Sequence, residues 1–119
     1  MVTSDLSARI NDVLRYVRIT RNMNAHMILS QALTLIAEDE DRLRAVEKEI
    51  YTPIADKTLR GPRAVQSTVR RASKVAWDFF PDRVQELAGY PLNGRPSAVA
   101  MLELLYNGVA RYDDLSILK

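Results

Sequence analysis

The 119-residue sequence contains no cysteine, so it can form neither a disulfide framework nor a thiolate zinc site. A chain without cysteine suits the reducing cytoplasm. No apolar run approaches the roughly 18 residues of a membrane span. The segment from Met1 to Asp12 is also too polar and too acidic for a signal peptide. We therefore expect a soluble cytoplasmic protein that does not contact a membrane.

Residues that commonly carry catalysis or bind metals are equally scarce. His26 is the only histidine, and the sequence supplies no partners for a nucleophile or a zinc site around it. A partly buried histidine or one at a helix end is the more ordinary interpretation. The acidic run from Glu38 to Asp41 lacks the spacing and the glycine of a calcium loop, which favours a solvated helix start. We expect no enzyme, no cofactor and no metal site.

The sequence shows no alternating strand pattern, no repeat and no low-complexity tract. Hydrophobic residues make up 47% and charged residues 27%, which is the composition of a folded domain. A chain of this length suits one domain with one core. Apolar residues recur at helical spacing instead, and this pattern predicts an all-α fold of residues 1–119.

Six segments have helical patterns and boundaries typical of helix ends. We expect helices over about 4–18, 23–37, 38–57, 62–80, 82–88 and 96–108, with a bend or restart of the third at Pro53. In the last helix Val99, Leu102 and Leu105 should face inward and Gly108 should end it.

Three aromatic residues and the tail complete the expected core. Trp77, Phe79 and Phe80 should pack against the last helix, which we favour over base stacking. The tail over 109–119 is mixed: Leu115, Ile117 and Leu118 dock it on the body, or its end frays.

The positive charge of the chain is sorted along the sequence. Totals nearly balance, with 17 Lys and Arg against 15 Asp and Glu. The segment from Lys57 to Trp77 nevertheless holds no acid and six basic residues, which are Lys57, Arg60, Arg63, Arg70, Arg71 and Lys74. Sorted positive charge is typical of a small domain that meets a polyphosphate.

The basic segment also has helical order. At about 100° per residue, one face carries Val65, Val69, Ala72 and Ala76, and the opposite face carries Arg63, Ser67, Arg70 and Lys74. A short helix with Ile50 and Ile54 turned inward precedes it, and Gly61 and Pro62 form a tight turn between the two. This order is that of a helix-turn-helix. A basic outer face by itself is more often only a solvated surface, and the preceding helix and turn favour DNA.

Position along the helix suggests two roles for the polar residues. The early part of a recognition helix reaches base edges, where Arg suits guanine and Gln suits adenine. The candidate base-reading residues are Gln66, Ser67, Arg70 and Arg71. The candidate phosphate contacts are Arg60, Arg63 and Lys74.

Several short motifs occur in a characteristic order and spacing. They are Tyr51 to Ala55, then Val65, Arg70 and Ala72, then Val75 to Trp77, Gly89 with Tyr90, and Pro96 with Ser97. Together they resemble the C-terminal DNA-binding domain of the sporulation response regulator of the stage-zero-A type, from endospore-forming bacteria. The resemblance is best over about residues 22–107 and leaves 108–119 as an extra tail.

The resemblance implies a compact bundle of about six helices with a recognition helix at about 62–78. It also implies double-stranded DNA as a partner, head-to-tail homodimers on a short DNA box, and a contact of residues 83–90 with RNA polymerase sigma factor. Gln66 and Ser67 replace the Glu and Arg that the family typically places there, so we expect a different or weaker sequence preference.

Two functions remain open. The first is a sequence-specific DNA-binding transcriptional regulator that lacks a receiver domain, because 119 residues cannot hold one beside the matched domain. Regulation would then come from concentration, a partner or the terminal segments. The second is a protein-interaction module of the same fold that has lost DNA readout and binds a regulator or a polymerase subunit.

Overall fold

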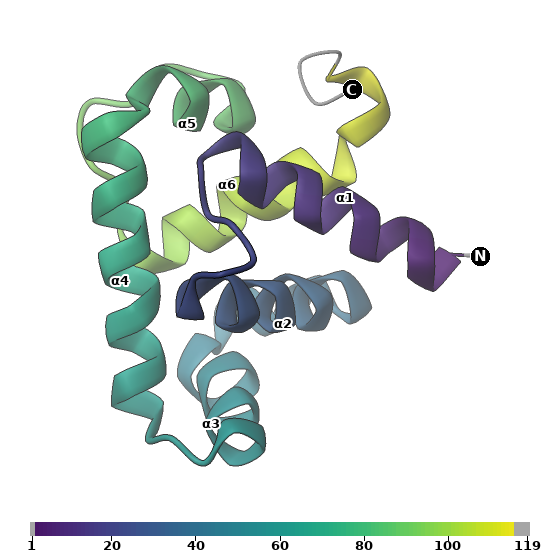
Figure 1. Cartoon of the computed structure of the whole chain (residues 1–119), viewed down its shortest axis with the longest axis vertical. Helices are drawn as coiled ribbons and strands as arrows, with labels where there is room; N and C mark the ends of the chain where they lie inside the picture. Colours follow the sequence, from purple (N-terminus) through teal and green to yellow (C-terminus); the bar gives the residue numbers. More distant parts are fainter. Residues whose placement is uncertain (1, 116–119) are drawn as a thin grey trace.

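Helix α4 forms one long side of the molecule, and four other helices pack against it. The computed structural model describes residues 2–115, with side chains from residue 5. Its α-helices are α1 (Val2–Tyr16), α2 (Asn24–Glu38), α3 (Thr52–Thr58), α4 (Pro62–Phe79), α5 (Pro81–Ala88) and α6 (Ala98–Ala110). Figure 1 shows α3 at one end of α4 and α5 at the other, while α2 and α6 contact the length between them. Helix α1 lies across α2 and α6.

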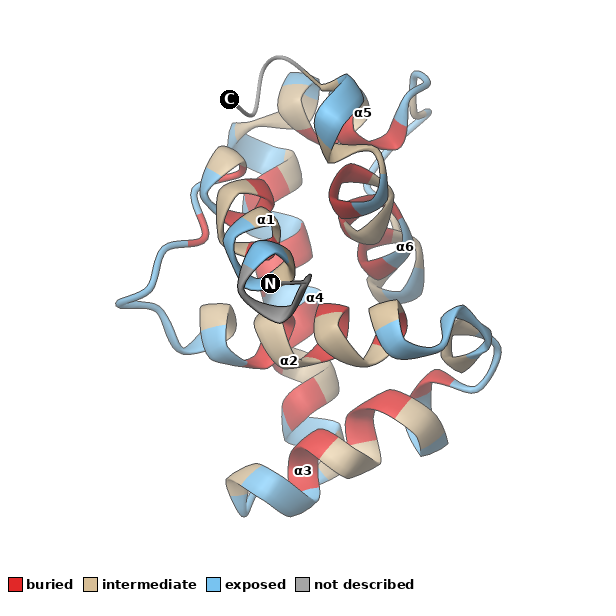
Figure 2. Cartoon of the chain, turned by 90° about the vertical axis from the view of Figure 1, so that its right-hand side faces the viewer, coloured by how far each residue is buried: buried red, intermediate tan, exposed pale blue. Residues whose placement is uncertain are grey.

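The core lies where α1, α2 and α6 face one another and α4. Figure 2 shows the buried residues of these helices on their facing sides. The central helix α2 buries Ile28, Leu29, Ala32, Leu33 and Ile36, and α6 buries Met101, Leu102, Leu104, Leu105, Gly108 and Val109. Each fully buried Leu or Ile contributes about 1.5–3 kcal/mol over an exposed one. Residues 2–115 contain no strand, which confirms the all-α prediction.

The segment predicted as one helix over 38–57 is divided. Asp39 ends α2, and its side chain accepts a hydrogen bond from the Asp41 backbone N at 3.0 Å. A 3₁₀ turn, η1 (Glu40–Arg44), follows, and Ala45 interrupts it at φ −143°. A π-helical turn, η2 (Glu47–Tyr51), then leads directly into α3. The restart predicted at Pro53 is confirmed, because α3 begins at Thr52. Proline is tolerated there, in the first turn of a helix.

The last helix begins as predicted and ends later. Ser97 caps α6 by accepting a hydrogen bond from the Ala100 N at 3.1 Å. Gly108 does not end the helix but lies buried within it, where a Cβ would come within 2.8 Å of Leu87 Cδ2. It therefore permits the close approach of α6 to α5. The prediction that Val99 faces inward is wrong, because this first-turn side chain is 41% exposed.

The aromatic residues near the end of α4 do not all join the core. Trp77 packs partly against it, as predicted. Phe79 is 71% exposed, so its predicted core position is wrong. Pro81 starts α5 directly after α4 ends, and the described residues leave position 79 uncovered. Phe80 is half-buried, and the guanidinium groups of Arg18 and Arg83 both lie over its ring.

The start of the tail docks on the body. A 3₁₀ turn, η3 (Tyr112–Asp114), is tied to α1 by a hydrogen bond from the Tyr112 hydroxyl to Asp12. Leu115 packs partly against the core, while Ile117 and Leu118 lie outside the described residues. Docking of the tail is thus confirmed as far as residue 115.

The turn between α3 and α4 depends on a leucine rather than on a glycine. Leu59 adopts the left-handed conformation at φ 58° and ψ 34°, and its N–H donates to the Ala55 carbonyl. Its side chain is 95% exposed, so no packing within the described residues compensates for the strain. Gly61 has an ordinary extended conformation at φ −76° and ψ 154°, and Pro62 opens α4 as predicted.

Replacing Leu59 with glycine should relieve the strain of its left-handed backbone. We expect Leu59→Gly to be about 1 kcal/mol more stable than Leu59→Ala, because glycine alone avoids the steric cost of a left-handed backbone. Urea unfolding of both variants measures the difference, and Leu59→Ala serves as the control for loss of the side chain. Equal free energies of unfolding would contradict the assigned conformation.

Tyr16 makes stability depend on pH in the alkaline range. Burial, and then the hydrogen bond from its hydroxyl to Glu86 at 2.8 Å, raise its pKa from 10.0 to about 12. A pKa raised by folding means that the contribution of Tyr16 is complete below pH 10 and is lost as the pH rises through about 12. Tyr16→Phe should therefore lose less stability than the parent between pH 10 and 12. Tyr90→Phe, at a 61% exposed site, should follow the parent. Identical pH profiles for Tyr16→Phe and the parent would refute this account.

Candidate nucleic-acid interface

The buried face of α4 determines which of its side chains point outward. Val65, Val69, Ala72 and Ala76 are buried, which confirms the predicted phase of this helix. Two polar residues on the buried side satisfy their hydroxyls within the helix. Thr68 donates to the Ala64 carbonyl at 3.0 Å, and Ser73 donates to the Val69 carbonyl at 2.9 Å. The hydroxyl hydrogen of each side chain is therefore already used within the helix.

The outward face of α4 carries unpaired positive charge. Arg63, Arg70 and Arg71 are exposed, and they form no ion pair within the part of the chain that the structure describes. Lys74 pairs with Asp78 four residues later at 2.7 Å, with both side chains more than two-fifths exposed. An exposed pair of this kind is worth only about 0.2–1 kcal/mol, so Lys74 can exchange Asp78 for another anion.

The turn before α4 is held against α2. The Arg60 Nη2 donates to the Asn24 Oδ1 at 3.0 Å, which ties the turn to the first residue of α2. Arg60 remains exposed, so one end of the basic face continues onto the turn.

The predicted base-reading residues divide into two groups. Ser67 lies near the middle of the outward face and is half-buried, and Arg70 and Arg71 flank it. Gln66 lies on the flank of α4 instead, where it lines a cavity of about 430 Å³ together with Tyr51 and Arg70. The structure thus brings all the predicted residues to α4 and its turn, but it does not place Gln66 on the outward face.

Two residues of this region were not predicted from the sequence. Arg95, in the loop before α6, is exposed and lines the same cavity. Tyr51 is only 3% exposed, and its hydroxyl has no hydrogen-bond partner in the described structure. The pKa of Tyr51 is raised by burial, and the nearby Arg70 guanidinium offsets part of that rise. The only sequence signal for Arg95 was its place just before a capped helix start.

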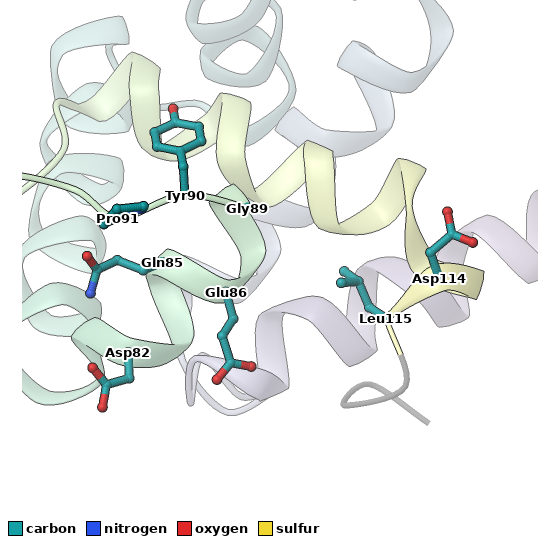
Figure 3. A pocket seen from close by; sticks show the side chains of 8 residues that line it. All are labelled: Asp82, Gln85, Glu86, Gly89, Tyr90, Pro91, Asp114 and Leu115. Carbon is teal, nitrogen blue, oxygen red and sulfur yellow. The ribbon is translucent and has the colours of Figure 1, made fainter.

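A second polar surface lies at the opposite end of α4 from the turn. Figure 3 shows a shallow pocket on α5 and the start of the tail, lined by Asp82, Gln85, Glu86, Gly89, Tyr90, Pro91, Asp114 and Leu115. Arg83 is turned away from this pocket. Its Nη1 donates to the Tyr16 carbonyl at 2.9 Å, and its guanidinium stacks on the Tyr16 ring. The charged side chains that line the pocket are all acidic.

The single histidine has a structural setting. His26 lies half-buried in the first turn of α2, where its Nδ1 is 3.4 Å from the Ser30 Oγ. Burial, and then the charge of Arg21, lower its pKa. Within residues 2–115, no group of three or more His, Cys, Asp or Glu side chains could hold a metal ion. The helices described there are also too short or too polar to cross a membrane.

Comparison with known proteins identifies the family. The family described as sporulation initiation factor Spo0A C terminal matches residues 10–109, which include the helix-turn-helix, the cavity and both polar surfaces up to Val109. This range is wider than the one predicted from the motifs. No solved structure matches the chain. Because the match covers most of its length, the chain belongs to the Spo0A C-terminal family of DNA-binding regulatory domains.

Proposed function

We propose that this chain is a sequence-specific DNA-binding transcriptional regulator that places α4 in the major groove of duplex DNA. The observation that carries the proposal is the outward face of α4, where three exposed arginines have no ion pair within the described residues. That face belongs to the second helix of a helix-turn-helix, which is the helix that enters the groove in this motif. As a regulator of transcription, the chain acts in the cytoplasm, where the DNA of a bacterium lies.

The residues of this face divide into those that contact base edges and those that contact phosphates. Arg70 and Arg71 lie where a recognition helix meets base edges, and a bidentate arginine on guanine discriminates by about 1–3 kcal/mol. Ser67 sits between them, and Gln66 reaches the groove only from the flank of the helix. Three further residues contact phosphates on either side, namely Arg60, Arg63 and Lys74.

Two partners beyond DNA form part of the proposal. Membership of the family supports homodimers that lie head to tail on the DNA. It also supports a contact with RNA polymerase sigma factor. For the latter, the acidic pocket on α5 with Asp82, Glu86 and Asp114 suits a basic partner surface better than Arg83 does, since Arg83 is engaged by Tyr16.

The protein-interaction module remains the second candidate. For base reading, Ser67 has a short side chain and Gln66 lies on the flank of α4. Val75 and Phe79 also expose apolar surface on α4 itself. If this candidate is correct, the purified chain will show no salt-dependent DNA binding in the low micromolar range.

Removing a phosphate contact should change the salt dependence of binding. We expect Arg63→Ala to reduce the slope of log affinity against log salt by about 0.9, on any duplex, because one fewer counterion is released. Fluorescence anisotropy with a labelled random-sequence duplex over a series of KCl concentrations measures this slope. Arg15→Ala is the matched control, since Arg15 is a 67% exposed arginine on α1, paired with Asp12. A slope unchanged in Arg63→Ala would show that α4 does not approach the phosphates there.

Removing a base contact should act on one sequence only. We expect Arg70→Ala to weaken binding to the preferred duplex about 5- to 150-fold, the equivalent of about 1–3 kcal/mol, with a much smaller loss on a scrambled duplex of the same composition. Competition between the two duplexes gives both values in one experiment. Equal losses on both would mean that Arg70 contacts phosphate and reads no base.

A further inference from the structure

The cavity beside α4 presents hydrogen-bond donors that no residue of the described chain uses. It has a volume of about 430 Å³ and is lined by residues of η2, α4, the loop before α6 and the first residues of α6. The wall on α4 is formed by Gln66, Arg70 and Ser73, so the cavity adjoins the outward face. A ligand in this cavity would therefore lie next to DNA held by α4.

The start of α6 contributes two free backbone amides. The Ser97 side chain satisfies only the Ala100 N–H, at 3.1 Å. The N–H groups of Ala98 and Val99 have no acceptor in the described structure, and both residues line the cavity. A helix of 13 residues carries a positive partial charge at this end, which favours an anion.

Tyr51 supplies an independent sign of a missing partner. Its side chain is 3% exposed and belongs to the cavity lining, yet its hydroxyl has no hydrogen-bond partner within residues 2–115. A buried hydroxyl normally has one, because leaving it unpaired is costly. Tyr51 and Arg70 both line the cavity, and the Arg70 guanidinium acts to lower the pKa of Tyr51.

The charge of the lining also favours an anion. Arg70 and Arg95 stand against a single carboxylate, Glu47, and none of the three forms an ion pair within the described chain. Of the two arginines, Arg95 belongs to this cavity alone, since Arg70 also lies on the outward face of α4. Guanidinium, amide and hydroxyl groups are all donors, and phosphate oxygens accept from each of them.

We propose that this cavity binds one phosphate group through Arg95, the amides of Ala98 and Val99, and the hydroxyl of Tyr51. The DNA backbone beside α4 is one source of that phosphate, and this source rests on the proposed function. A free phosphorylated ligand is the other source of the same chemistry. With DNA, the site anchors the duplex at the flank of α4 and limits the angle at which the helix enters the groove.

The amide resonances of Ala98 and Val99 provide a direct test. We expect them to shift in ¹⁵N–¹H spectra of the full chain when inorganic phosphate or a short random-sequence duplex is added. Shifts at lower concentrations of duplex than of phosphate identify the DNA backbone as the source. The reverse order identifies a free ligand. Absence of a shift with both probes would overturn the proposal.

Two variants test whether the named side chains build the site. Arg95→Ala should abolish the phosphate-induced shifts and reduce the salt slope of duplex binding by about 0.9, while the control Arg15→Ala keeps both. Tyr51→Phe should weaken phosphate binding without loss of folding stability, because it removes a hydroxyl that is unpaired in the free protein. Unchanged phosphate binding in both variants, or a destabilised Tyr51→Phe, would overturn the assignment.

The two proposals can fail separately. If the chain binds no duplex but phosphate still shifts the two amides in an Arg95-dependent way, the phosphate site stands and the DNA-binding proposal falls. If the chain binds duplex with the expected salt slope but neither probe shifts these amides, the phosphate site falls alone.

Discussion

The packing of α4 against α2 and α6 is the constraint on which the interface depends. Val65, Val69, Ala72 and Ala76 all lie on one side of α4 and are buried, so the helix cannot rotate without exposing them. That single orientation directs Arg63 and Arg70 outward and turns Gln66 toward the cavity. The apolar residues of α4 therefore decide which of its polar residues can meet a ligand, although they contact none themselves.

Periodicity made this orientation predictable, because a strict helical repeat of apolar residues leaves only one face to bury. The same reasoning found α2, α5 and the capped start of α6. It failed after α2, where the segment predicted as one helix divides into 3₁₀ and π turns, and it did not reveal the left-handed conformation of Leu59 in the turn before α4. The exposure of Phe79 at the end of α4 could not be predicted from the sequence either, because it depends on the direction that α5 takes.

The candidate site also contains residues that the sequence predicted and residues that it did not. Its residues on α4 and in the turn are close in sequence, so their charge and spacing revealed them. Arg95 and Tyr51 lie far from each other in sequence and meet at one cavity only because η2 and the start of α6 both pack beside α4. No local pattern marks either residue as part of a binding site, and an unpaired buried hydroxyl can be recognised only in three dimensions. The Leu59 conformation adds a strained, exposed residue to the turn that precedes α4, and strain of this kind persists mainly at functional sites.

We propose that α4 reads a specific DNA sequence although it carries Gln66 and Ser67. Selection of bound duplexes from a random-sequence library, with the purified chain at near-physiological salt, tests it most directly. We expect enrichment of one short motif with a guanine at the position that Arg70 reaches, and loss of that preference in the same selection with Arg70→Ala. Recovery of duplexes without any common motif would contradict it and would favour the protein-interaction module.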